Sequence, residues 1–143
     1  MGQRQMTREE WHAFVLEGTR TGGFAVPRKD GSPHVLPVWF ALDGDDFMFT
    51  TGAGTVRGKS LLRDGRGCML VDEEQAPYSF VKAEGRCAVS EDPGELLRWA
   101  TVVGGRYMGA DRAEEFGARN GVPGELLVRF TPERLFAQWG VTE

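Results

Sequence analysis

The stretch TTGAGTVRGKS at positions 50–60 decides between two different folds for this chain. It is a glycine-rich turn that carries two cations, Arg57 and Lys59, and leads into an expected helix. Main-chain N–H groups exposed by glycine, a helix N-terminus and nearby cations together favour the binding of a phosphate group. The stretch therefore predicts an anion site, and the surrounding fold indicates which phosphate compound it binds.

A nucleotide-binding P-loop is the first interpretation to test, because Gly58, Lys59 and Ser60 match the end of the pattern G-x-x-x-x-G-K-[ST]. That pattern needs its first glycine at position 53, which is alanine. A P-loop also follows a buried parallel strand, whereas the strand expected before this turn is the second arm of a hairpin. Both observations argue against a P-loop.

Tight turns divide the rest of the chain into short extended runs. Asp30-Gly31 and Asp43-Gly44 are hairpin signals, and Glu84-Gly85 has the form of a bulge inside a longer strand. The expected strands cover residues 24–26, 33–42, 47–50, 67–71, 78–90, 126–131 and 135–139.

Capping residues mark the helices. Thr7 and Glu10 form a capping box, and Thr55 can cap a short helix that runs to about Arg63. Asp92-Pro93 opens a third helix, which we expect to end at Gly104-Gly105, and a fourth helical piece covers about 110–120.

Six or seven short antiparallel strands with three or four flanking helices predict a fold that is mostly β with some α. Such strands favour a closed or nearly closed barrel, because closure removes exposed sheet edges. We expect one domain over residues 1–143, with a core that includes Val35, Val38, Phe47, Phe49, Met69 and Val71.

Composition and charge argue against some classes of binding partner. The formal net charge of −4 argues against a general nucleic-acid binder, because binding to the phosphate backbone needs a basic surface. The N-terminus has no apolar signal core and no run is long enough to span a membrane, so we expect a cytoplasmic protein. Cys68 and Cys87 lie in apolar runs and are expected to be reduced core residues.

The chain has few reactive groups of its own. No G-x-S-x-G elbow is present, and neither His12 nor His34 forms a convincing site with serine or cysteine. No metal-ligand pattern occurs, and the acidic cluster at 43–46 is typical of a solvated turn. We therefore predict no catalytic side chain and no metal, and expect the chemistry to come from an organic redox cofactor. Its flat ring could lie against Trp39, Phe40, Tyr78 and Phe80, although ordinary core or dimer packing explains these aromatic residues equally well.

The order of several motifs resembles one known family. These motifs are GSPHVLPVWF at 31–40, DGD at 43–45, FTT at 49–51, Arg57 with Lys59, LLRDGR at 61–66, PY at 77–78 and EGR at 84–86. Together they resemble the pyridoxamine 5′-phosphate oxidase-like, FMN-binding split-barrel family, and more narrowly its branch that uses the deazaflavin coenzyme F420. The similarity covers about residues 7–139. It implies a six-stranded split barrel that forms a homodimer, with the cofactor in a groove between the subunits.

The resemblance also implies which residues bind the cofactor. Arg57 takes the position of the cation that binds the phosphate, with Lys59 beside it, and either could be the main contact because the family more often has lysine at position 57. The remaining implied contacts are the hydroxyls of Thr50 and Thr51, the strand residues Pro37, Val38 and Trp39, and Tyr78 and Phe80 of the second subunit.

The second strand favours the deazaflavin over FMN. FMN-using members of the family place an arginine and a lysine on this strand, but no lysine or arginine occurs between Lys29 and Arg57. The deazaflavin also carries an oligoglutamate tail, to which Arg63 or Arg66 could offer weak charge pairs.

The implied activity is hydride transfer between the deazaflavin C5 and an unsaturated small molecule such as an enone, quinone or tetrapyrrole. His34, Tyr78 or solvent could supply the proton, and residues 107–109 could either line or fill the acceptor pocket. Two alternatives stay open, an FMN-dependent oxidase and a non-catalytic F420 carrier.

Overall fold

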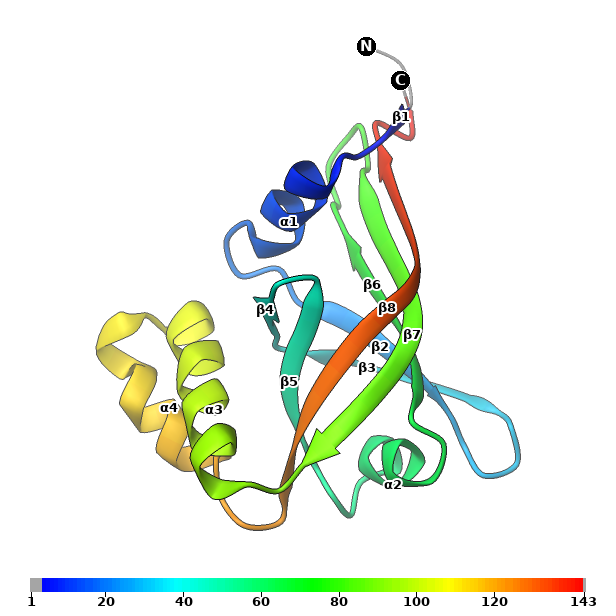
Figure 1. Ribbon diagram of the computed structural model, residues 1–143. Coiled ribbons are helices and arrows are strands. Elements are labelled where there is room, and N and C mark those ends of the chain that lie inside the picture. The colour runs from blue at the N-terminus through cyan, green and yellow to red at the C-terminus, as the bar shows by residue number, and fades with distance from the viewer. Residues whose placement is uncertain (1–3, 143) are drawn as a thin grey trace.

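The computed structural model describes residues 4–142 and contains one antiparallel sheet and four α-helices (Figure 1). The strands are β1 (Arg4–Gln5), β2 (Gly22–Pro27), β3 (Pro33–Val38), β4 (Ala41–Asp43), β5 (Asp46–Gly52), β6 (Arg66–Asp72), β7 (Phe80–Ser90) and β8 (Glu125–Trp139). The helices are α1 (Arg8–Leu16), α2 (Val56–Arg63), α3 (Pro93–Met108) and α4 (Ala113–Asn120), with a 3₁₀ turn η1 (Ala110–Arg112). The expected class, mainly antiparallel β with four helices, is confirmed.

The sheet is strongly coiled. Its strand order is β3-β2-β6-β7-β8-β5-β4, and β1 adds to β8. In Figure 1, β2 and β3 pass behind the long strands β7 and β8, α1 lies near the end where both termini lie, and α2 lies at the opposite end. The helices α3 and α4 pack side by side at one flank. Aromatic and β-branched side chains fill the interior, among them Phe24, Phe47, Phe49, Phe130 and Val128.

Local sequence signals explain most of the boundaries. Gly31 and Gly44 have φ values of 89° and 62°, which are left-handed conformations that glycine adopts readily, and they make the two expected hairpin turns. Thr7 and Glu10 form the expected capping box: the Glu10 N–H donates to Thr7 Oγ1 (3.2 Å), and the Thr7 N–H donates to Glu10 Oε1 (2.9 Å). Asp92 caps α3 through the Glu95 N–H.

The third helix does not end at Gly104-Gly105, as the sequence suggested, but continues to Met108. The reason is packing between α3 and α4. A Cβ atom on Gly104 would lie 2.7 Å from Phe116 Cβ, so this glycine allows two helices to approach closely and does not act as a cap.

The two strands expected after residue 125 are one strand, β8. Pro132 interrupts the sequence pattern but not the sheet, because it faces Gly85 where the β7–β8 register shifts. This shift confirms the bulge expected at Glu84-Gly85. Strand β7 begins at Phe80 and not at residue 78, because Tyr78 has a positive φ of 60°.

Two burial predictions, for Val35 and Cys68, are wrong, and for Phe40 the structure agrees with the alternative of core packing. Val35 is 61% exposed, because it lies on the outer face of the terminal strand β3. Phe40 is completely buried and therefore offers no surface to a ring. Cys68 lines a pocket on the outer face of the sheet, whereas Cys87 does pack against the core. The other expected core residues, Val38, Phe47, Phe49, Met69 and Val71, are buried.

The part of the chain from 4 to 142 contains no helix that is long and apolar enough to cross a membrane.

Candidate functional site

Two free strand edges flank the opening of the barrel. Within the described residues β3 pairs only with β2, and the lower part of β5, from Phe49 to Gly52, pairs only with β8. The two strands diverge from the β3–β4 corner, which we define as Trp39 and Phe40. Their free N–H and C=O groups can bind a polar ligand. We call the space between these edges the split.

The predicted phosphate cation, Arg57, lies beside the end of β5. Its Nε donates a hydrogen bond of 3.1 Å to the hydroxyl of the buried Thr51, and its guanidinium carbon lies 5.8 Å from the centroid of the Phe49 ring. Burial lowers the pKa of Arg57 below its ordinary value. Nη1 of Arg57 is buried and has no hydrogen-bond partner among the described residues. A buried donor without an acceptor is costly, so an oxyanion at this nitrogen would stabilise the site.

Glu125 is the acidic residue whose charge acts on Arg57. It faces Gly52 across the β5–β8 ladder, and its charge attracts the Arg57 guanidinium. Burial raises the pKa of Glu125, which its attraction to Arg57 partly offsets.

The turn before α2 is closely packed, and this explains why position 58, which matches part of the P-loop pattern, is a glycine. Thr55 Oγ1 accepts from the Gly58 N–H (3.0 Å) and donates to the Gly52 carbonyl (2.8 Å). A Cβ atom on Gly58 would lie 2.0 Å from that same carbonyl oxygen. Gly58 is therefore required by close backbone approach.

Lys59 does not lie beside β5 with Arg57. Its side chain is exposed and lines a recess of about 400 Å³ between α2 and the β2–β3 turn, together with Arg28, Lys29, Asp30 and Arg63. Of the two cations that the sequence offered for the phosphate, Arg57 is the one whose side chain contacts β5.

The predicted ring-side strand has mixed exposure. Pro37 is exposed, Val38 is buried in the core, and the Trp39 ring stacks on Tyr107 with centroids 4.9 Å apart and planes 7° apart. His34, four residues before Val38 on the same face of β3, has a buried Nδ1 without a hydrogen-bond partner in the described chain.

Arg106 and Tyr107 hold the corner from which the split opens, and sequence reasoning missed the role of both. Arg106 donates to the carbonyls of Phe40 (2.6 Å) and Val15 (2.8 Å). The Tyr107 hydroxyl accepts from the Phe40 N–H (3.2 Å) and donates to the Arg20 carbonyl (2.7 Å). Both main-chain groups of Phe40 are thus bound by the end of α3. The available signal was an Arg-Tyr pair directly after Gly104-Gly105.

Strand β7 begins, at Phe80, at the end of the sheet away from α2 (Figure 1), and Tyr78 comes two residues before it. Tyr78 is 47% exposed, and Phe80 packs on Phe136 with ring centroids 5.8 Å apart. A single chain therefore does not bring them to Arg57. Their predicted role requires a second copy of the chain.

No group of His, Cys, Asp or Glu residues between 4 and 142 could hold a metal ion. The acidic cluster in the β4–β5 turn is neutralised by neighbouring cations. Asp45 accepts from Arg8 (2.8 Å) and pairs with His12 (2.7 Å), while Asp43 and Asp46 both accept from Arg129.

One family model matches most of this chain, and several solved structures share its fold. The family model described as pyridoxamine 5′-phosphate oxidase matches residues 7–139. A conserved hypothetical protein, Rv2991 from Mycobacterium tuberculosis, is 26% identical, with a TM-score of 0.83 over 96% of this chain and 86% of its own. A structure named F420 reductase is 23% identical, with a TM-score of 0.67 over 86% of this chain and 94% of its own. HutZ, the heme storage protein from Vibrio cholerae, is 16% identical, with a TM-score of 0.74 over 95% and 98% of the two chains. A search of curated proteins finds no match.

Proposed function

Because the chain belongs to the pyridoxamine 5′-phosphate oxidase family, whose members bind flavins or deazaflavins, we propose that it is a coenzyme F420-dependent oxidoreductase. When bound, the deazaflavin would exchange a hydride with an unsaturated small molecule such as an enone, quinone or tetrapyrrole. The chain would supply binding and orientation.

The observation that carries the proposal is the unsatisfied Nη1 of Arg57. It lies beside Thr51 at the end of β5, next to the free edge of that strand. A phosphate oxygen would complete its hydrogen bonding, and Thr51 already fixes the guanidinium through Nε. The cofactor ring would then lie along the split, against the main chain of residues 37–39. His34, whose Nδ1 also lacks a partner, lies on the same strand. The residues present therefore fit a phosphate-bearing ring compound.

Two features support the deazaflavin over FMN. Strand β3 carries no cation. The recess beside α2 is lined by four cations, Arg28, Lys29, Lys59 and Arg63, and by one carboxylate, Asp30, so it keeps an excess of positive charge in a chain with a net charge of −4. The carboxylates of an oligoglutamate tail that leaves the phosphate at Arg57 would find cationic partners there, each contributing weakly because the recess is exposed.

The chain itself would act by placing the two reactants. The β3–β4 corner is bound on both sides by Arg106 and Tyr107, so the backbone beside the split is rigidly held. Holding a donor and an acceptor at near-attack distance lowers a barrier substantially without an acid or base in direct contact.

We further propose that the protein is a homodimer. The outer face of β6, β7 and β8 exposes Leu70 (44%) and Phe136 (41%), and Phe80 lies beside Phe136. A second copy that covers this face would bury these side chains and could bring its Tyr78 and Phe80 to the split. Sedimentation velocity tests this: a dimer that dissociates on Phe136→Glu supports the proposal, and a monomer at all concentrations contradicts it.

The cofactor is tested by fluorescence titration of the apo-protein with coenzyme F420 and with FMN. We expect tight binding of the deazaflavin and binding of FMN that is at least tenfold weaker, by about 1.4 kcal/mol. Tight FMN binding without deazaflavin binding would favour the FMN-dependent oxidase instead. Retained deazaflavin binding, with no oxidation of the reduced cofactor by any enone or quinone, would favour the carrier.

A further inference from the structure

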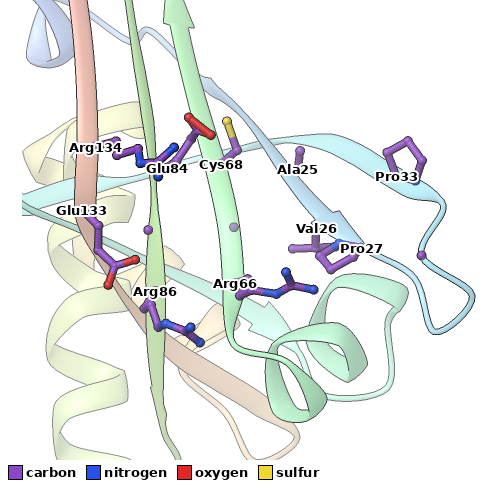
Figure 2. Close-up of a pocket in the computed structure, with 13 residues that line it drawn as sticks. Ala25, Val26, Pro27, Pro33, Arg66, Cys68, Glu84, Arg86, Glu133 and Arg134 are labelled. Carbon is purple, nitrogen blue, oxygen red and sulfur yellow. The ribbon is translucent and has the colours of Figure 1, made fainter.

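One cavity in the described chain lies on the outer face of the sheet. It has a volume of about 680 Å³, a size typical of small-molecule sites. Figure 2 shows that its wall is formed by β2, the β2–β3 turn, β6, β7 and β8. We call it the outer pocket. Of the residues predicted to contact the cofactor, only Arg66, one of two candidate partners of the oligoglutamate tail, lines it.

Three arginines, Arg66, Arg86 and Arg134, line the outer pocket (Figure 2). They differ from every other arginine between residues 4 and 142. Each of the others has a hydrogen bond, an ion pair or an aromatic ring beside its guanidinium. Within the same described residues these three have none, and all three border one cavity.

Two of these arginines face each other and repel when no ligand lies between them. Arg66 on β6 and Arg86 on β7 are directly opposite in the antiparallel register. Like charges at opposite positions of two strands destabilise the sheet, and arginine usually avoids this by pairing with a carboxylate. An anion bound between the two guanidinium groups would turn the repulsion into two attractive contacts.

The carboxylates of the pocket do not supply this anion. Glu84 faces Arg134 across the β7–β8 ladder, but its nearest cation is Lys82, with Nζ 3.7 Å from Oε2. Pro132 pairs with Gly85 and Arg134 pairs with Glu84, so Glu133 between them is the extra residue of the bulge. Glu133 has no ion pair within the described chain. The lining carries three arginines against two glutamates, so it keeps an excess positive charge.

The other side of the pocket is apolar. Ala25, Pro27 and Pro33 form this wall and offer no hydrogen-bond donor from their side chains. A ligand that fits both sides has an oxyanion group at one end and a compact apolar body at the other. We propose that the outer pocket binds a small organic oxyanion, a phosphate ester or a polycarboxylate, through Arg66 and Arg86, with Arg134 at its rim.

Calorimetric titration of the full-length protein at low salt tests this site, with citrate as the polycarboxylate probe and glycerol 2-phosphate as the phosphate-ester probe. At least one probe should bind, and the stronger one identifies the class. Arg66→Gln combined with Arg86→Gln should weaken that binding about tenfold or more, because charged bidentate contacts are lost. The matched control is Arg98→Gln combined with Arg119→Gln, which removes the same charge from α3 and α4 and should leave the affinity within about twofold.

Stability provides the second measurement. Without a probe, the Arg66→Gln and Arg86→Gln double variant should melt at or above the wild-type temperature, because a repulsive pair is removed. Arg134→Gln leaves the opposed pair in place and should weaken probe binding by a smaller factor. This variant replaces the double variant in the test if the double variant does not fold.

Four results would overturn the proposal. The first is that neither probe binds the wild type, and the second is that the control variant loses as much probe affinity as the Arg66→Gln and Arg86→Gln double variant. The third is that saturating coenzyme F420 displaces the bound probe. The fourth is that the double variant loses dimerisation but keeps its probe affinity. The third would assign the pocket to the cofactor tail, and the fourth would assign the arginine pair to a subunit interface.

Discussion

Two partly buried arginines in this molecule differ in how many hydrogen bonds their guanidinium groups make. Arg106 in the α3 region donates through Nη1 and Nη2 to the main-chain carbonyls of Phe40, Val15 and Arg20 and to the Tyr107 hydroxyl, and its buried Nε has no acceptor among the described residues. Arg57 in the α2 region donates to Thr51 through Nε and leaves a buried Nη1 without an acceptor among the described residues. Burial lowers the pKa of both groups.

The difference separates a structural cation from a candidate binding cation. The four hydrogen bonds of Arg106 tie α1, α3 and the β3–β4 corner together. Arg57 is oriented by one hydrogen bond to Thr51, and its buried Nη1 has no acceptor among the described residues. Because a guanidinium has five N–H donors, Arg57 has more unused donors than Arg106 and is the better candidate for ligand binding.

The largest effect is expected when the structural cation is removed. Arg106→Leu should lower the free energy of unfolding by about 3–4 kcal/mol, because it leaves several buried carbonyls without donors. Arg98→Leu, which loses only an exposed contact over Trp99, should cost less than about 1 kcal/mol. Urea denaturation measures both. Equal losses in the two variants would show that Arg106 does not hold the corner.

The next largest effect is expected in the α2 region, where a glycine allows two main-chain segments to approach closely. Gly58→Ala should destabilise the protein by about 2–3 kcal/mol, because the added Cβ atom would meet the Gly52 carbonyl oxygen at 2.0 Å. Gly54→Ala is the control: nothing lies within 4 Å of its Cβ position, and we expect a change of less than about 1 kcal/mol. Thermal unfolding distinguishes them, and a Gly58→Ala variant as stable as wild type would refute the packing explanation of this glycine.

A smaller effect should follow from the acidic neighbour of Arg57. Glu125→Gln removes a negative charge that competes with a bound phosphate, so cofactor affinity at neutral pH should rise about threefold. Burial raises the pKa of Glu125, so this carboxyl becomes neutral at a higher pH than an ordinary glutamate as the pH falls. The advantage of the variant should therefore shrink as the pH is lowered through that raised pKa. Cofactor titrations over a pH series measure this, and an advantage independent of pH would contradict it.

Local sequence signals predicted the parts of the molecule that depend on neighbouring residues. The capping box at Thr7, the turns at Gly31 and Gly44 and the helix capped by Thr55 all occur as expected. The hydrogen bond between Arg57 and Thr51 also joins residues only six positions apart, but no local signal predicted it, because the family resemblance named the two residues only as cofactor contacts. Each of the predicted features is encoded within one turn or one hairpin.

Features that join distant segments were not predictable in this way. The contact of Arg106 with Phe40 spans 66 residues, and the exposure of Val35 follows from the position of β3 at the end of the strand order. Gly104 resembled a helix stop because the sequence does not show that Phe116 packs against it. The outer pocket is the clearest case, because its three arginines come from β6, β7 and β8 and meet only when the sheet forms.

The central claim is that Arg57, and not Lys59, binds the phosphate of the cofactor. Its most direct test is an equilibrium titration of coenzyme F420 with the wild type, Arg57→Ala and Lys59→Ala, alongside thermal unfolding of each. Loss of a buried charged contact should weaken binding by Arg57→Ala about 100-fold, whereas the exposed Lys59→Ala should cost less than about fivefold. Both variants should melt close to the wild-type temperature. Wild-type affinity in Arg57→Ala, or a larger loss in Lys59→Ala, would contradict the account.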